Sequence, residues 1–323
     1  MKKTVSALII CLAMVLSGCA ASARSAKEVH IAIQPSAAFI PLYVAKEKGW
    51  IEEALEPMGV TVKWESFESG PPMNESLLAG DSDVGVIGDV PVANVCAPGN
   101  DVSLVAIAAQ AADSYAILVP TDSPISSAED LKGKSIATTF GSTAHNMVEK
   151  YLQTAGLSMD DVDLVNISTG DAASVLFGGQ ADAVSIWEPN VTRITSDGSV
   201  RILASGSECG LAGTNGIVAR NEYAAANPEI ITQILAQYKR AANELSDLDD
   251  ATASLVAAEL NVTEEQMEQM IPKFRYTVEI TQEDITALND TIRFLNDNKI
   301  LRKDYDITES VDDSYEKEYL EKR

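Results

Sequence analysis

The chain has 323 residues with a formal net charge of −24, and 46% of its residues are hydrophobic. This hydrophobic fraction is typical of a globular protein, and roughly 300 residues are enough for two domains that each have a core. The negative charge argues against nucleic acid or anionic lipid as a partner, because both would be repelled. Any anion that binds must therefore be captured by a local site.

The first residues resemble a bacterial lipoprotein signal. Two lysines and an apolar run precede the tetrapeptide LSGC, which ends at Cys19. The run has the length of a signal-peptide hydrophobic region and is shorter than the ~20 residues that a spanning helix needs. This pattern predicts a signal peptide over 1–18, lipid attachment at Cys19 and a tether over 19–27, which would anchor the protein outside the cytoplasmic membrane.

Strands and helices alternate through the next part of the chain. Apolar and β-branched runs between turn residues predict strands over 29–34, 60–67, 83–87, 102–109 and 115–119. Helical spacing of apolar residues predicts a helix after each of the first three strands, the third beginning near Pro91. The turns at the ends of the first and third strands hold residues 35–39 and the pair Gly88-Asp89.

Two prolines within 120–124 mark the beginning of a second strand-and-helix unit. Its strands are predicted over 135–138, 162–167, 183–186, 200–204 and 214–219. A helix is predicted to begin at about Ser142 and another to cover 171–177. From Glu222 onward the apolar spacing predicts helices to the end of the chain.

The turn over 140–145 is a candidate anion site, because it joins a short buried strand to an amphipathic helix. The first N–H groups of a helix have no partner within it and carry partial positive charge. The backbone and hydroxyl groups around Ser142, Thr143 and Ala144 can therefore hold an anion. The alternative is that Ser142 or Thr143 only caps its own helix.

The alternation of strands and helices in both parts predicts open α/β sheets with helices on both faces. In such sheets, ligands bind outside the carboxyl ends of the strands. The predicted binding region is therefore the set of turns that follow the strands.

Four segments together resemble the solute-binding proteins of ABC importers in the nitrate, sulfonate and taurine group. They are PLYVAKEKGWIEEAL at 41–55, LLAGDSDVGVIGDVP at 77–91, EDLKGKSIATTFGSTAH at 129–145 and DAVSIWEPN at 182–190. The resemblance extends over roughly residues 28–245 and is strengthened by the lipoprotein signal.

This resemblance implies a two-lobed periplasmic-binding-protein-like fold of type II, in which crossing strands join the lobes. The first lobe would comprise 28–116 and 213–323, and the second 117–212. It also implies a small-molecule solute, an ABC permease and its ATPase as partners, and neither a cofactor nor an enzymatic activity. The crossings would fall near 114–120 and 205–214.

The resemblance also implies which residues line the cleft between the lobes. They are Ser36, Ala37, Phe39, Gly88, Asp89, Ser114, Ser142, Thr143, Ala144, His145, Trp187, Glu188, Thr214 and Asn215. None of these turns contains Lys or Arg, which argues against nitrate or bicarbonate as the solute. Asp89 and Glu188 are then the only formal charges expected near the site.

These features favour a sulfonate or a taurine-like zwitterion, since neutral donors suit the sulfonate and the two acids suit an amine. A thiamine-precursor pyrimidine stacked on Trp187 is an alternative. Ser142 and His145 could also indicate an enzyme related to pyrimidine synthases, but no acidic orienting residue accompanies them. Two histidines and no clustered cysteines predict no metal site, and whether Cys96 and Cys209 pair is left open.

Overall fold

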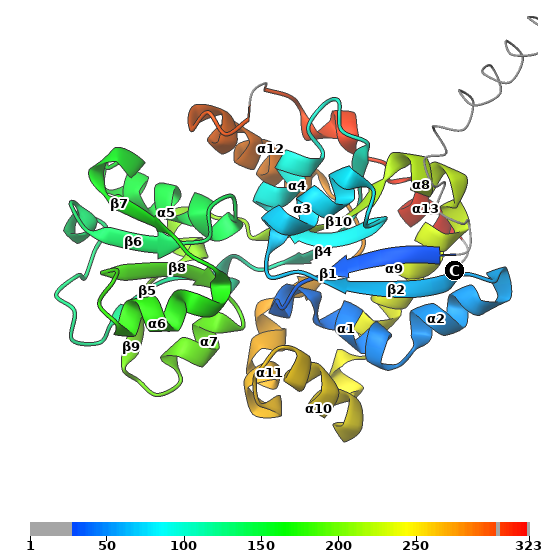
Figure 1. The fold of residues 1–323 in the computed structure, drawn as a ribbon, viewed down its shortest axis with the longest axis horizontal. Helices are drawn as coiled ribbons and strands as arrows, with labels where there is room; N and C mark the ends of the chain where they lie inside the picture. The colour runs from blue at the N-terminus through cyan, green and yellow to red at the C-terminus, as the bar shows by residue number, and fades with distance from the viewer. Residues whose placement is uncertain (1–27, 302–303, 322–323) are drawn as a thin grey trace, which may run out of the picture.

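Two separate β-sheets organise the computed structural model, which describes residues 28–301 and 304–321 (Figure 1). The predicted signal peptide and tether, together with Cys19, lie outside these residues. The strands of the first lobe's sheet are, in spatial order, β11 (Arg275–Tyr276), β4 (Val102–Gln110), β10 (Thr214–Arg220), β3 (Val84–Gly88), β1 (Glu28–Ile33) and β2 (Thr61–Ser66). Those of the second lobe's sheet are β7 (Asp163–Asn166), β6 (Ser135–Thr138), β8 (Ala183–Trp187), β5 (Tyr115–Pro120) and β9 (Val200–Ser205).

Both sheets are mixed, because each combines parallel and antiparallel strand pairs. In the first sheet β1 is parallel to β2 and β3, whereas β10 is antiparallel to β3 and β4. In the second sheet β6 is parallel to β7 and β8, whereas β5 is antiparallel to β8 and β9. β5 and β10 are the first strands after the chain crosses between lobes, so the crossings set their reversed direction.

Helices cover both faces of the first sheet, as the alternating pattern predicts. The helices of the first lobe are α1 (Ile40–Glu47), α2 (Trp50–Leu55), α3 (Gly70–Ala79), α4 (Asp89–Val95), α8 (Asn221–Ala226), α9 (Pro228–Asn243), α10 (Asp250–Glu259), α11 (Glu264–Met270), α12 (Gln282–Asp297) and α13 (Ser314–Glu321). The apolar sides of α1, α2 and α9 pack on one face, and those of α3, α4 and α12 on the other (Figure 1). The predicted fold class is confirmed.

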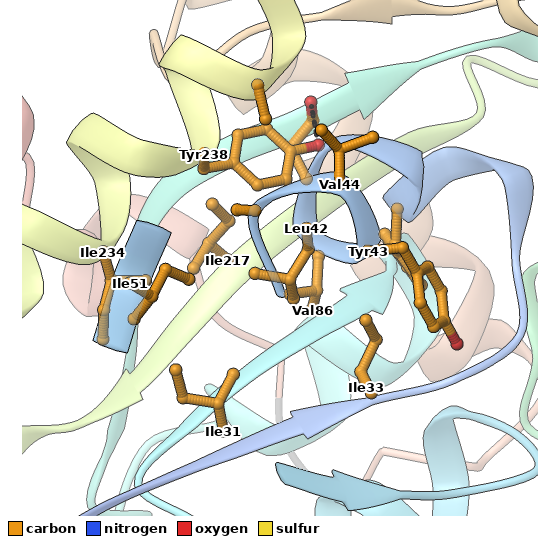
Figure 2. Close-up of a cluster of buried hydrophobic side chains, with 14 of the residues drawn as sticks. Ile31, Ile33, Leu42, Tyr43, Val44, Ile51, Val86, Ile217, Ile234 and Tyr238 are labelled. Carbon is orange, nitrogen blue, oxygen red and sulfur yellow. Dashed lines mark hydrogen bonds between the residues drawn. The ribbon is translucent and has the colours of Figure 1, made fainter. Parts of the chain in front are cut away.

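The core under α1 and α9 fixes the turn at the end of β1. Figure 2 shows Leu42 of α1 and Tyr238 of α9 among Ile31, Val86 and Ile217 of the sheet, all buried. The hydroxyl of Tyr238 donates to the carbonyl of Ala108 at 3.0 Å, so the one polar atom of this side chain is satisfied in the core.

The second lobe has a smaller core between its sheet and three helices. These helices are α5 (Thr143–Thr154), α6 (Ala172–Phe177) and α7 (Asn190–Thr195). Met147 and Leu152 of α5 are fully buried against Ile136 and Val184 of the sheet. This packing holds the start of α5 at the edge of the sheet that faces the first lobe.

Two connections join the lobes and lie side by side. Residues 111–114 lead from β4 to β5, and residues 206–213 lead from β9 to β10. The N–H of Ala111 donates to the carbonyl of Gly213 at 3.1 Å, which ties one connection to the other. In the part of the chain that the structure describes, no helix is long and apolar enough to cross a membrane.

The prediction that only helices follow residue 222 is wrong at one point. β11 pairs antiparallel with β4, matching Arg275 with Gln110 and Tyr276 with Ala109. A strand of two residues is too short to produce an alternating pattern, so its pairing depends on tertiary contacts that the local sequence does not encode.

Candidate functional site

A cavity lies between the lobes, at the ends of strands from both sheets. It is lined by Gln34, Ser36, Gly70, Gly88, Pro91, Tyr115, Ser142, Thr143, Trp187 and Asn215. None of these residues carries a formal charge. The space open to the centre of a water molecule is about 20 Å³, which holds about one water. The lobes are therefore closed on each other, and a larger solute can enter only when they separate.

The turn after β1 contributes two polar side chains to this cavity. Gln34 is 5% exposed, and its Oε1 has no hydrogen-bond partner among the described residues. Ser36 caps the following turn by accepting from the N–H of Ala38 at 3.2 Å. Of the other predicted residues here, Ala37 donates its N–H to the carbonyl of Glu188 at 3.2 Å, and Phe39 lies in the core.

The start of α5 forms as the sequence indicates, one residue later than predicted. Ser142 is the N-cap: its Oγ accepts from the N–H of His145 at 3.3 Å and donates to the carbonyl of Thr139 at 2.6 Å. No group within 28–301 or 304–321 accepts from the N–H of Thr143 or Ala144. Ser142 thus has the capping role, and two N–H groups of the helix start remain available to an anion.

A buried carboxylate stands directly behind this helix start. Asp89, the first residue of α4, is 2% exposed. Its Oδ1 accepts from Thr143 Oγ1 at 2.5 Å and from the N–H of Val90 at 2.7 Å, and its Oδ2 accepts from Thr291 Oγ1 at 2.9 Å. Burial raises the pKa of Asp89, and these hydrogen bonds oppose the rise.

The contact between Thr143 and Asp89 depends on Gly88. A Cβ placed on Gly88 would lie 2.6 Å from Thr143 Oγ1, closer than non-bonded atoms approach. The glycine at this strand end therefore permits the second lobe to approach the first so closely.

Trp187 and Glu188 end β8 and have different roles. Trp187 is 6% exposed and contributes both to the cavity wall and to the core of the second lobe. Glu188 is 1% exposed and does not line the cavity. Its Oε1 accepts from Lys273 Nζ at 2.5 Å and from Thr192 Oγ1 at 2.8 Å, and its Oε2 accepts from the N–H of Thr192 at 2.9 Å.

The expectation that Asp89 and Glu188 are the only charges near the site is therefore wrong. Lys273 precedes β11 in the first lobe and forms an ion pair with Glu188 of the second lobe. The side chain of Glu188 is 0% exposed, so this ion pair links the lobes through a buried group. The sequence does not indicate this ion pair, because Lys273 lies in a segment predicted to be helical and is 85 residues from Glu188.

The remaining predicted residues divide between the cavity and the connections. Asn215 lines the cavity, where its Oδ1 accepts from the hydroxyl of Tyr115 at 3.4 Å. Thr214 is 1% exposed, and its Oγ1 has no partner among the described residues. Ser114 donates to the carbonyl of Ala111 at 2.7 Å within the first connection. The side chain of Ala144 is buried in the core of the second lobe.

His145 faces aromatic side chains. Its ring stacks on Phe140 with centroids 4.9 Å apart and meets the edge of Phe294 at 6.2 Å. Burial lowers the pKa of His145. Since the hydroxyl of Ser142 donates to Thr139, the serine and the histidine do not form a nucleophile and base pair.

Four cavity residues were absent from the sequence prediction: Gln34, Gly70, Pro91 and Tyr115. Gln34 is the last residue before the predicted turn, and Tyr115 was assigned only to a strand. In the described ranges, no group of three His, Cys, Asp or Glu side chains could hold a metal ion. Cys96 and Cys209 are both free, the first buried and the second half-buried.

Comparisons with known proteins identify the family. Residues 36–249 match the family model described as NMT1/THI5 like. The chain belongs to this family. A Bacillus subtilis protein named as an aliphatic-sulfonates-binding protein is 32% identical over 97% of this chain and 96% of its own length. The taurine-binding periplasmic protein of Escherichia coli is 29% identical over 54% of each chain.

Solved structures show the same family relation. The alkanesulfonate-binding protein SsuA from Xanthomonas axonopodis pv. citri, bound to MOPS, has a TM-score of 0.80 and 28% identity, covering 88% of this chain and 98% of that chain. The desulfurization enzyme DSZB has a TM-score of 0.68 and 18% identity over 92% of this chain and 99% of that chain, a likeness of fold alone.

Proposed function

We propose that this protein is the extracytoplasmic solute-binding component of an ABC importer and that its solute is a small sulfonate. The observation that carries the proposal is the cavity between the lobes, whose polar lining consists of neutral groups. Its family membership and its likeness to sulfonate-binding relatives over most of its length support the same assignment. The protein would deliver the solute to a membrane permease and, through it, to the ATPase.

A sulfonate suits this cavity because it stays ionised and needs no cationic partner. The side-chain amide of Gln34 and the hydroxyl of Ser36 are donors from the first lobe. The unpaired N–H groups of Thr143 and Ala144 are donors from the second lobe, at a helix start that favours negative charge. A solute held by both lobes would stabilise the closed arrangement, and the lobe division 28–116 with 213–323 against 117–212 stays a prediction for the moving units.

We propose that the protein binds its solute without catalysing a reaction. An enzyme of the same fold would need an activated nucleophile, and Ser142 is engaged as a helix cap while His145 stacks on Phe140. The absence of Lys and Arg from the cavity lining argues against nitrate and bicarbonate, and an aminopyrimidine would leave the helix start without an anion.

Tryptophan fluorescence tests the proposal, because Trp187 lines the cavity. We expect taurine or propanesulfonate to change the emission of the wild-type protein in a saturable manner, and the change to disappear in Trp187→Phe. A saturable change with nitrate or an aminopyrimidine, and none with any sulfonate, would overturn the assignment.

We also expect Cys19→Ala to move the protein from the membrane fraction to the soluble fraction without changing its solute affinity. The proposed anchor is covalent lipid at this cysteine, so its removal leaves only the receptor body. Fractionation followed by immunoblotting measures the distribution. Undiminished membrane retention of Cys19→Ala would mean that another element anchors the protein.

A further inference from the structure

The hydroxyl proton of Thr143 is already used in the closed structure. Thr143 Oγ1 donates to Asp89 Oδ1 at 2.5 Å, and Thr143 also lines the cavity between the lobes. A threonine hydroxyl has one proton and therefore donates one such bond at a time. A solute anion that accepts this proton removes it from Asp89.

Loss of the hydrogen bond from Thr143 would destabilise the carboxylate of Asp89. Asp89 is 2% exposed, and among the residues that the structure describes it would keep only the N–H of Val90 and the hydroxyl of Thr291 as donors. A buried carboxylate that loses a donor while a second anion binds nearby is disfavoured by burial and by like-charge repulsion. Asp89 therefore needs either a proton or a positive charge when a sulfonate binds.

The groups that face Asp89 do not supply enough positive charge. Lys150 of α5 acts on it through space, whereas Glu283 and Asp290 of α12 line the same cavity as Asp89 and Lys150. Tyr115 faces Asp89 as a neutral phenol, because burial and the carboxylate raise the pKa of Tyr115. Asp290 is paired with Arg293 at 3.0 Å, so among the groups that line this cavity Lys150 is left to balance the carboxylates of both Asp89 and Glu283.

A second cavity, lined by Asp89, has space for a positively charged group. The cavity that Asp89 lines lies behind Thr143, between α5, α12 and the segment 210–212, and has a volume of about 260 Å³. This is many times the volume that one water needs, so an ammonium group on a short alkyl chain fits. Thr143 lines the cavity between the lobes and Asp89 lines this one, so the two cavities adjoin at the hydrogen bond between these residues, and a solute that breaks this bond can reach both.

We infer, resting on the proposed function, that Asp89 determines the solute class by selecting sulfonates that carry an ammonium group over plain alkanesulfonates. The sulfonate accepts the hydroxyl proton of Thr143, and the ammonium group of the same solute takes its place beside Asp89. A plain alkanesulfonate brings no cation, so it binds only as Asp89 takes up a proton from water. The carboxylate is thereby a specificity-determining residue that the cavity lining itself does not include.

Calorimetry with 3-aminopropanesulfonate and propanesulfonate tests this inference, because the two differ only in the amine. At about pH 8 we expect the amine-bearing solute to bind the wild-type protein at least about tenfold more tightly. As the pH falls, propanesulfonate should bind more tightly, by up to about tenfold per pH unit, with uptake of up to one proton. Repeating the titration in buffers with different heats of ionisation measures the number of protons taken up.

Asp89→Asn removes the charge at nearly constant shape. We expect the affinity ratio of the two solutes to fall to about one in this variant, with no proton uptake for propanesulfonate. Asp83→Asn is the matched control, since Asp83 is 1% exposed and lies just before β3, whereas Asp89 lies just after it. The control should keep the wild-type ratio and proton uptake.

Equal affinities in the wild-type protein without proton uptake, or an unchanged ratio in Asp89→Asn, would overturn the inference and leave sulfonate binding intact. Failure of both solutes to bind any of the three proteins would overturn the proposed function as well. The wild-type pH series decides the matter even when Asp89→Asn does not fold.

Discussion

Gly213→Ala is expected to destabilise the protein by about 3 kcal/mol or more, because it disturbs the point where the two connections between the lobes touch. Gly213 has φ +64°, and a Cβ added there would lie 2.4 Å from the carbonyl oxygen of Ala111 and 2.8 Å from the backbone N of Ala112. Both atoms belong to the other connection and cannot move independently of β4. Urea unfolding followed by circular dichroism measures the change.

Gly210→Ala separates the cost of the positive φ from the cost of the steric clash with the other connection. Gly210 lies in the same connection with φ +73°, and a Cβ added there would have no heavy atom within 4 Å. Gly210→Ala should therefore destabilise the protein only by the cost of a positive φ for a residue with a Cβ, about 1 kcal/mol. Equal losses in Gly210→Ala and Gly213→Ala would show that the connections do not pack as the structure has them.

Lys273→Met is expected to lower the free energy of unfolding by about 2 kcal/mol, because it leaves the carboxylate of Glu188 buried without its cation. Breaking a fully buried ion pair by removing one partner costs about 3–5 kcal/mol, and the 34% exposure of the Lys273 side chain reduces that cost. Since the pair links the lobes, small-angle scattering of the variant should also show a larger radius of gyration.

A double-mutant cycle attributes the effect to the pair. Glu188→Gln combined with Lys273→Met should recover part of the loss, since no unpaired carboxylate then remains. Lys132→Met is the matched control, because Lys132 is 67% exposed and pairs with Asp161 at 3.2 Å on the surface. Its loss should be about 0–1 kcal/mol. A loss for Lys273→Met no larger than for Lys132→Met would contradict the role of the buried pair.

The sequence predicted much of the fold because its elements are locally encoded. The start of α5 was predicted from a glycine turn and helical spacing, and the structure begins this helix at Thr143 with Ser142 as its cap. Gly88 and Trp187 were placed at strand ends, and the structure brings both to one cavity. The general geometry of α/β sheets is enough to predict such positions.

The pairing of side chains could not be predicted in the same way. The ion pair between Glu188 and Lys273 joins groups 85 residues apart, and the bond between Thr143 and Asp89 joins groups 54 residues apart. Which of two neighbouring polar side chains faces a cavity depends on the packing of the lobes, so Gln34 was missed and Glu188 was assigned to the cleft. Asp89 is near the cleft as expected, but behind Thr143.

Isothermal titration calorimetry of the purified protein against propanesulfonate, 3-aminopropanesulfonate, nitrate and an aminopyrimidine tests the central claim most directly. The proposed function predicts one sulfonate bound per chain, with Kd in about the micromolar range or tighter, and no saturable heat from nitrate or the aminopyrimidine. Saturable binding of nitrate or the aminopyrimidine, with no heat from either sulfonate, would contradict it.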